Sequence, residues 1–167
     1  MNDELDVRIA KLEPMRVAWV NGYGEQPEGE AWRKILAFAN AQNLLDDLKA
    51  RRFFGYNNPD PSPGTPNYGY DQWITVGPEI SSQDEIQIKD FDGGLYAVAS
   101  CVGVENIGIT WKNLVRWFED SKYDKGNHQW LEEVLNPEVF IKPDGTPNQT
   151  EETLGLVKFD LYLPIVE

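Results

Sequence analysis

Hydrophobic and polar positions along this chain follow two different spacings. The segments 7–12, 16–20, 86–91 and 95–102 are short and either alternate or are rich in apolar, β-prone residues, which predicts strands. Two other segments carry apolar residues at positions i, i+3, i+4 and i+7, which predicts one apolar face on each of two helices. The residues are Trp32, Ile35, Leu36 and Ala39, and Trp111, Leu114, Val115 and Phe118.

The same order of elements occurs twice. A shift of 79 residues aligns 7–39 with 86–118 without a gap, and both copies contain Gly-x4-Gly-x2-Trp. Two Gly-Thr-Pro-Asn turns follow, at 64–67 and 145–148. Each unit is therefore predicted to run strand, strand, helix, strand, turn, strand, with a second helical piece around 44–50 and around 130–135.

This repeat predicts an α+β fold. We expect a mostly antiparallel sheet with two long helices on one face and a pseudo-twofold axis between the units. A single domain is expected over 1–167, with unit one at about 5–80, unit two at about 84–166 and the junction at 81–85. The opposite face of the sheet is expected to lack helices, which makes it the predicted ligand surface.

The charge balance narrows the choice of partners. The formal net charge of −13 opposes binding to phosphate backbones and anionic membranes, and favours cationic ligands or simple solubility. The start of the chain has no basic segment followed by an apolar run, so the cytoplasm is the expected compartment. With one histidine and one cysteine, no His/Cys metal cluster can form, and no cofactor is expected.

The candidate site depends on an alternation near the end of the second unit. A strand over 137–141 would place Glu138 and Phe140 on the helix-free face, with Val139 and Ile141 beneath the helices. A carboxylate beside aromatic rings is costly to desolvate unless a positive group meets it. The alternative is that Glu138 lies at an exposed edge. The pair Glu132 and Glu133 is interpreted as a solvated helix face.

Aromatic residues predicted on the same face extend this candidate site. A groove that stacks flat apolar or cationic molecules would be formed by Trp19, Trp73, Tyr96 and Phe140, with Tyr68 at its rim. The alternative for each ring is ordinary core packing. Trp32 and Trp111 are expected to pack in the helix core rather than contact a ligand.

The sequence resembles a GyrI-like domain, the effector-binding module of AraC- and MerR-type regulators. The resemblance is carried by the repeated Gly-x4-Gly-x2-Trp and by YGYDQWITV at 68–76, LYAVASCVG at 95–103, PEVFIKPDGT at 137–146 and LYLPI at 161–165. It implies two β-α-β-β units in an eight-stranded sheet, and a groove for hydrophobic, cationic or planar aromatic compounds. Its acidic ligand residue matches Glu138, whereas Phe140 replaces a tyrosine of many relatives.

Three functions remain open from the sequence. The first is a stand-alone drug- or effector-binding protein, acting by sequestration or for a separate regulator. The second is a hydrolase that opens strained rings of DNA-alkylating natural products, in which Glu138 would activate water and Tyr96 would aid the leaving group. The third is an acidic protein-interaction module.

Overall fold

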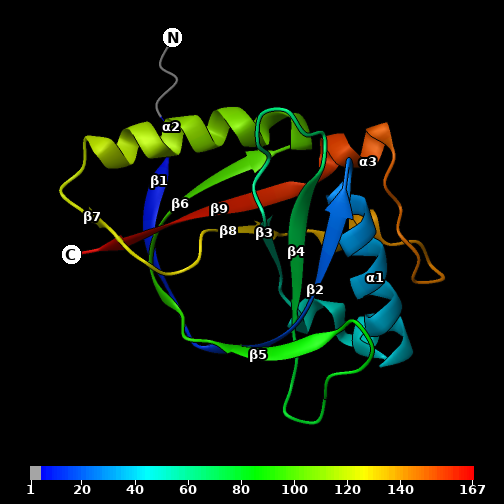
Figure 1. Cartoon of the computed structure of the whole chain (residues 1–167). Helices are drawn as coiled ribbons and strands as arrows, with labels where there is room; N and C mark the ends of the chain where they lie inside the picture. The colour runs from blue at the N-terminus through cyan, green and yellow to red at the C-terminus, as the bar shows by residue number, and fades with distance from the viewer. Residues whose placement is uncertain (1–4) are drawn as a thin grey trace.

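The computed structural model describes residues 5–167 (Figure 1). Within these residues the chain forms nine strands, three α-helices and three 3-10 helices, which alternate as the sequence pattern predicts for an α+β fold. In chain order they are β1 (Val7–Leu12), β2 (Met15–Gly24), α1 (Pro27–Ala41), η1 (Leu44–Ala50), β3 (Phe53–Asn57), β4 (Tyr68–Thr75), β5 (Gln87–Phe91), β6 (Gly94–Val102), η2 (Val104–Asn106), α2 (Ile107–Glu119), β7 (Asp124–Lys125), β8 (Leu131–Val134), η3 (Pro137–Phe140), α3 (Glu151–Leu156) and β9 (Lys158–Val166).

The strand order confirms the predicted repeat. The sheet runs β1-β6-β9-β8-β3-β4-β2-β5, with β7 paired to the end of β9, and every pairing is antiparallel. The first strand of each unit pairs with the second strand of the other unit, because β1 lies beside β6 and β5 beside β2. The third strands, β3 and β8, meet at the centre. The two units are thus interlocked around a pseudo-twofold axis between β3 and β8.

The predicted elements after α2 are partly wrong. The segment expected to be helical at 130–135 contains strand β8, whose residues pair with both β3 and β9. The strand expected at 137–141 is instead the 3-10 turn η3. The backbone of β8 can form hydrogen bonds with two neighbouring strands, which favours a strand over a helix. Burial then alternates with period two, because Leu131 and Glu133 are buried and Glu132 and Val134 are only partly buried.

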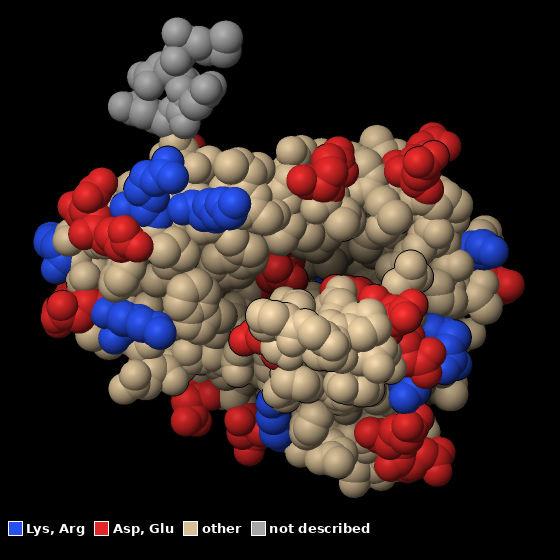
Figure 2. All heavy atoms as spheres, turned by 45° about the horizontal axis from the view of Figure 1, so that its top comes forward, with Lys and Arg blue, Asp and Glu red and all other residues tan. Residues whose placement is uncertain are grey.

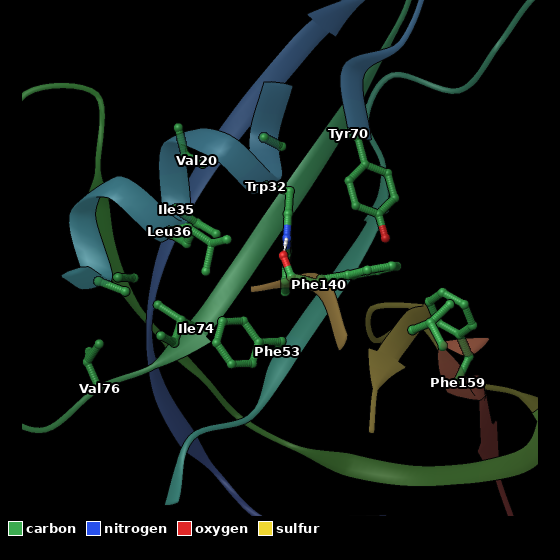
Figure 3. Packing of buried hydrophobic residues seen from close by; sticks show 14 of the residues in the cluster. Val20, Trp32, Ile35, Leu36, Phe53, Tyr70, Ile74, Val76, Phe140 and Phe159 are labelled. Carbon is green, nitrogen blue, oxygen red and sulfur yellow. Dashed lines mark hydrogen bonds between the residues drawn. The ribbon is translucent and has the colours of Figure 1, made fainter. Parts of the chain in front are cut away.

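The main core lies between the sheet and the helices (Figure 3). The predicted stripe of α1 is fully buried there, with Ile35 and Leu36 both at 0% exposure, and each such side chain contributes about 1.5–3 kcal/mol of burial free energy. The stripe of α2 behaves differently, since Leu114 is buried but Trp111 is only partly buried. Part of the α2 stripe is therefore exposed, although sheet residues beneath it such as Ala99 and Leu161 are fully buried.

The face of the sheet opposite the helices is not open, which corrects the expectation of an uncovered ligand surface. The sheet curls so that this face packs against itself as a second core. Ring centroids lie 5.2 Å apart for Trp73 and Phe91 and 5.4 Å apart for Tyr96 and Tyr162. Right-handed twist accumulates over consecutive strands, so a sheet of this width can close over one of its own faces.

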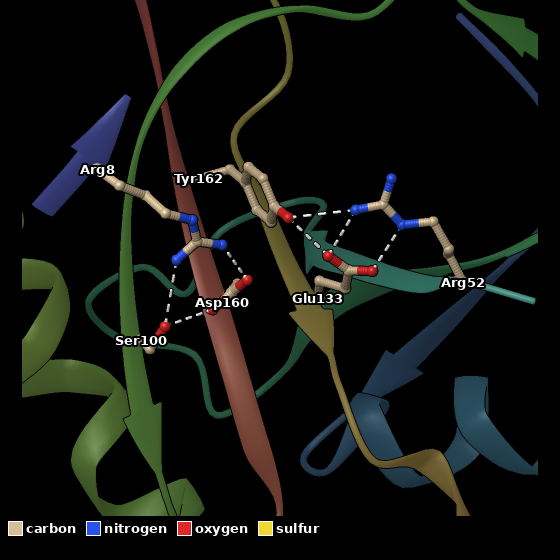
Figure 4. Close-up of polar contacts among 6 residues, drawn as sticks. All are labelled: Arg8, Arg52, Ser100, Glu133, Asp160 and Tyr162. Atoms are coloured by element: carbon tan, nitrogen blue, oxygen red, sulfur yellow. Dashed lines mark hydrogen bonds and ion pairs between the residues drawn. The ribbon is translucent and has the colours of Figure 1, made fainter. Parts of the chain in front are cut away.

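Two acidic side chains lie side by side in this second core (Figure 4). Glu133 of β8 is directly opposite Asp160 of β9 in the strand register. The guanidinium of Arg52 donates to both carboxylate oxygens of Glu133 at 2.8 and 2.9 Å, while Arg8 pairs with Asp160. Like charges at opposed positions destabilise a strand pair, so each carboxylate is compensated by its own arginine.

Among residues 5–167, no helix combines the length and the apolar character needed to cross a membrane.

Candidate functional site

A cavity of about 730 Å³ lies between α2 and the chain that follows β3, where Trp111 and Trp130 of the main-core side and Tyr56 and Leu131 of the second-core side meet in its lining. Figure 2 shows the surface hollowed in this region, with acidic side chains at the hollow. The cavity is lined by residues from β3, α2 and the segment leading into β8: Tyr56, Asn57, Asp60, Trp111, Lys112, Val115, Arg116, Glu119, Gln129, Trp130, Leu131 and Glu132.

The position of the cavity follows from where the central strands stop pairing. The β3–β8 ladder covers Phe53 to Gly55 on one strand and ends at the pair Gly55 and Glu132. Beyond it, Tyr56 and Asn57 pair with β4 alone. The two central strands therefore separate at Glu132, and the cavity opens beside the strand residues that lack a partner.

Glu132 is the least exposed of the acidic residues in this lining. Its carboxylate accepts hydrogen bonds from Trp111 Nε1 at 2.8 Å and from the hydroxyl of Tyr70 at 3.0 Å. Among the described residues, no lysine or arginine lies within ion-pair distance of it. Burial raises the pKa of Glu132 above its ordinary value, and the two hydrogen bonds partly offset this effect. The carboxylate is thus held by neutral donors and lacks a counter-charge.

A second carboxylate, at the start of α1, increases the negative potential. The hydroxyl of Tyr68 donates to Glu28 at 2.6 Å, and repulsion from Glu28 contributes to the raised pKa of Glu132. Burial, followed by the bond to Glu28, raises the pKa of Tyr68 to about 12. Burial and Glu132 likewise raise the pKa of Tyr70 well above its ordinary value. Both tyrosines therefore stay protonated and act as hydrogen-bond donors to the acids.

Aromatic rings and a mixed rim of charges surround the carboxylate. The rings of Trp111 and Trp130 lie with centroids 5.5 Å apart and planes tilted by 46°. Tyr56 contributes a third ring to the lining. The exposed rim carries two basic residues, Lys112 and Arg116, and two acidic ones, Asp60 and Glu119, whereas Glu132 is the acidic residue of the lining that is not exposed.

The structure separates the residues that the sequence predicted as one groove. Trp73 and Tyr96 are 1% and 0% exposed in the second core. Trp19 is partly buried on the same face, with the Lys89 ammonium 4.8 Å from its ring centroid. Tyr68 lies on the helix side beside Glu28, close to the acidic group of the cavity.

Glu138 and Phe140 lie in η3 rather than on a strand. Phe140 is buried in the main core, 5.6 Å from Trp32 by ring centroids, and its carbonyl accepts a hydrogen bond from the Trp32 indole (Figure 3). The side chain of Glu138 is exposed and is not part of the cavity lining. A ligand-binding role for Glu138 stays a prediction that this placement does not support.

The residues that sequence reasoning missed are Glu132, Trp111, Trp130 and Tyr56. The segment around β8 was interpreted as a helix, which made Glu132 and Glu133 adjacent solvated positions. As a strand, the same residues place Trp130 and Glu132 on one face and Leu131 and Glu133 on the other. Period-two alternation over only five or six residues was the available signal.

Gly55 makes room for the Tyr70–Glu132 contact, and we expect Gly55→Ala to break it. A Cβ at this position would lie 2.5 Å from ring atoms of Tyr70. The ring would have to move away from Glu132, at a cost of about 1–3 kcal/mol for overpacking. Urea unfolding should show this loss, and a wild-type midpoint for Gly55→Ala would contradict the packing.

Comparison with known proteins identifies the family. The family model described as "Cass2: Integron-associated effector binding protein" matches residues 8–165. A search of curated proteins gave no match. Effector-binding domains of MerR-type regulators share this GyrI-like fold, which confirms the predicted resemblance.

Solved structures of similar fold have low sequence identity to this chain. The EcmrR–DNA complex has a TM-score of 0.70 at 10% identity, over 98% of this chain and 58% of that chain. The EcmrR C-terminal domain has a TM-score of 0.67 at 11% sequence identity, and the match covers 98% of each chain. Integron cassette protein VCH_CASS2 of Vibrio cholerae has a TM-score of 0.56 at 12% sequence identity, over 96% of this chain and 95% of that chain. SAV2435, bound to tetraphenylphosphonium, has a TM-score of 0.52 at 9% sequence identity, over 97% of this chain and 94% of that chain.

These structural similarities show a shared fold, and the present chain spans little more than half of the EcmrR chain. The family model, by contrast, covers nearly all of the sequence. The chain therefore belongs to the family of integron-associated effector binding proteins.

Proposed function

We propose that the cavity beside α2 binds an aromatic small-molecule cation, with Glu132 as its counter-charge. The observation that carries this proposal is the Glu132 carboxylate. It is held by two neutral donors in an aromatic-walled cavity and, among residues 5–167, has no cationic partner. The protein would act as an effector- or drug-binding module, for sequestration or on behalf of a regulator.

The energetics of a desolvated carboxylate favour this class of ligand. A ligand cation would supply the charge that Glu132 lacks, whereas a neutral analogue would leave the carboxylate uncompensated. The ring of Trp111 attracts cations through its quadrupole and stacks on planar groups, while the ring of Trp130 already has the Lys125 ammonium 5.5 Å from its centroid. The cavity volume of about 730 Å³ falls within the usual range for small-molecule sites.

The comparisons with known proteins support small-molecule binding in general, without specifying the ligand. The family is one of effector-binding proteins, and the similarly folded SAV2435 has been solved with tetraphenylphosphonium, an aromatic cation. The net charge of −13 would also raise the local concentration of a cation near the protein.

A paired titration tests the proposal. We expect N-methylacridinium to quench the tryptophan fluorescence saturably and to bind more tightly than acridine, its neutral analogue of similar shape, at a pH where acridine is uncharged. Mass spectrometry of the recovered ligand should show it intact. Equal affinities for the two compounds would contradict the charge pairing.

A further inference from the structure

A second cavity, of about 240 Å³, lies on the other face of the sheet from Glu132. It is lined by residues of the second core, of β5 and of the segment before β8: Trp73, Lys89, Asp90, Phe91, Asp92, Gly93, His128 and Gln129. Strand alternation along β5 places Lys89 and Phe91 on the face of the second core. Lys89 is therefore the one cationic side chain directed into this cavity from the described part of β5.

The Lys89 amine is enclosed by aromatic rings. Nζ lies 4.5 Å from the ring centroid of Trp73, 4.8 Å from that of Trp19 and 5.8 Å from that of Tyr56. It donates a hydrogen bond to the hydroxyl of Tyr56 at 3.2 Å. Within residues 5–167, no carboxylate comes within 4.0 Å of Nζ. A hydroxyl and ring faces thus take the place of the carboxylate that usually accompanies a buried lysine.

We propose that Lys89 is a nucleophilic amine and that this cavity admits small aldehydes, which condense with it to form an imine. The nitrogen lone pair attacks the carbonyl carbon, the C=O π electrons pass to oxygen, and a carbinolamine forms after proton transfer from nitrogen to oxygen. Loss of the hydroxyl as water, with the remaining nitrogen proton, gives the C=N bond. No oxidant or reductant is consumed, and the inference does not rest on ligand binding at Glu132.

The surroundings of Lys89 suit both the amine and the carbonyl. Burial lowers the pKa of Lys89, and attraction by Asp71 partly offsets this, so the free amine is more accessible than on an exposed lysine. The indole N–H of Trp73, a residue of the cavity lining, is buried and has no acceptor among the described residues, so this wall of the cavity holds an unused donor. Tyr56, whose pKa is raised by burial, stays protonated and can donate to the departing hydroxyl.

Reductive trapping on the intact protein tests this inference. The probe is benzaldehyde with sodium cyanoborohydride at neutral pH, followed by proteolysis and peptide mapping by mass spectrometry. Lys122 and Lys125 are matched internal controls, because each is exposed and lies over a single ring, at 5.4 and 5.5 Å from the ring centroid. We expect the first benzyl group on Lys89, and loss of this preference when the protein is unfolded in urea.

The variant Lys89→Arg keeps a cation over the rings but cannot form the imine. It should lose the Lys89 adduct while Lys122 and Lys125 are modified at wild-type rates. Modification of Lys89 no faster than these two controls in the folded protein would overturn the inference. It would leave Lys89 as a structural cation that fills its aromatic surroundings.

Discussion

Replacing Glu132 with glutamine is expected to weaken N-methylacridinium binding by about 10- to 100-fold, while changing the affinity for acridine little. The loss corresponds to about 1.5–3 kcal/mol for a hydrogen-bonded or paired charge in a partly buried site. Glutamine is well suited to the position. Its carbonyl can accept from Trp111 Nε1 and its amide can donate to the Tyr70 hydroxyl, which replaces both observed bonds. The change therefore removes charge and little else.

The matched control is Glu138→Gln, the same substitution at the acidic residue that the sequence predicted. Glu138 is exposed on η3 and does not line the cavity, so its variant should bind both probes as the wild type does. Isothermal titration of the four combinations decides between the two glutamates. A selective loss of the cation in Glu138→Gln, with none in Glu132→Gln, would transfer the proposed site to η3.

The pH dependence of the wild type and of Glu132→Gln distinguishes the effect of Glu132 on cation binding from its effect on stability. Burial raises the pKa of Glu132 above the ordinary 4.5, so lowering the pH protonates it early and should reduce cation affinity in the wild type but not in Glu132→Gln. For stability the sign is opposite. The folded state favours the protonated acid, so wild-type stability falls as the pH rises through the raised pKa. Glu132→Gln should therefore be at least as stable as the wild type at neutral pH, and melting at several pH values checks this.

The sequence specified the local elements and the repeat because these depend on residues close together in the chain. The stripe of Trp32, Ile35, Leu36 and Ala39 follows from helical geometry alone, and all four residues are buried as predicted. The same spacing in α2 does not lead to the same burial, since Trp111 stays partly exposed. Spacing shows which side of a helix faces inward, but the depth of burial depends on what lies opposite.

The site itself depended on long-range geometry that short patterns do not encode. The curl of the sheet buries Trp73 and Tyr96, which the sequence placed on an open face. The importance of Glu132 arises where β3 and β8 separate, a feature set by the pairing of segments nearly eighty residues apart. Only the alternation from Trp130 to Val134 pointed to this, and it competed with an equally short helical interpretation.

The second large effect is expected on the free energy of unfolding, when Arg52 is replaced. We predict that Arg52→Met lowers the free energy of unfolding by about 2–3 kcal/mol, because it leaves the Glu133 carboxylate in the second core without a positive partner. The side chain of Glu133 is only 7% exposed, whereas that of Arg52 is 42% exposed, so water reaches the arginine but not the acid. Urea unfolding at neutral pH measures the loss. A change below about 0.5 kcal/mol would show that the pair behaves as an exposed one.

The control is Arg8→Met, the same substitution at the neighbouring ion pair. Arg8 is 53% exposed and donates to a single oxygen of Asp160, whereas Arg52 donates to both oxygens of Glu133, so the loss of Arg8 should cost less than that of Arg52. In Arg52→Met, adding Glu133→Gln should recover stability because no charge then remains uncompensated opposite Asp160.

Alternation along β8 places Glu133 on the face away from Glu132. Neither Arg52→Met nor this double variant should therefore change N-methylacridinium affinity, and a parallel loss of binding and stability would contradict the assignment of the two glutamates to separate faces.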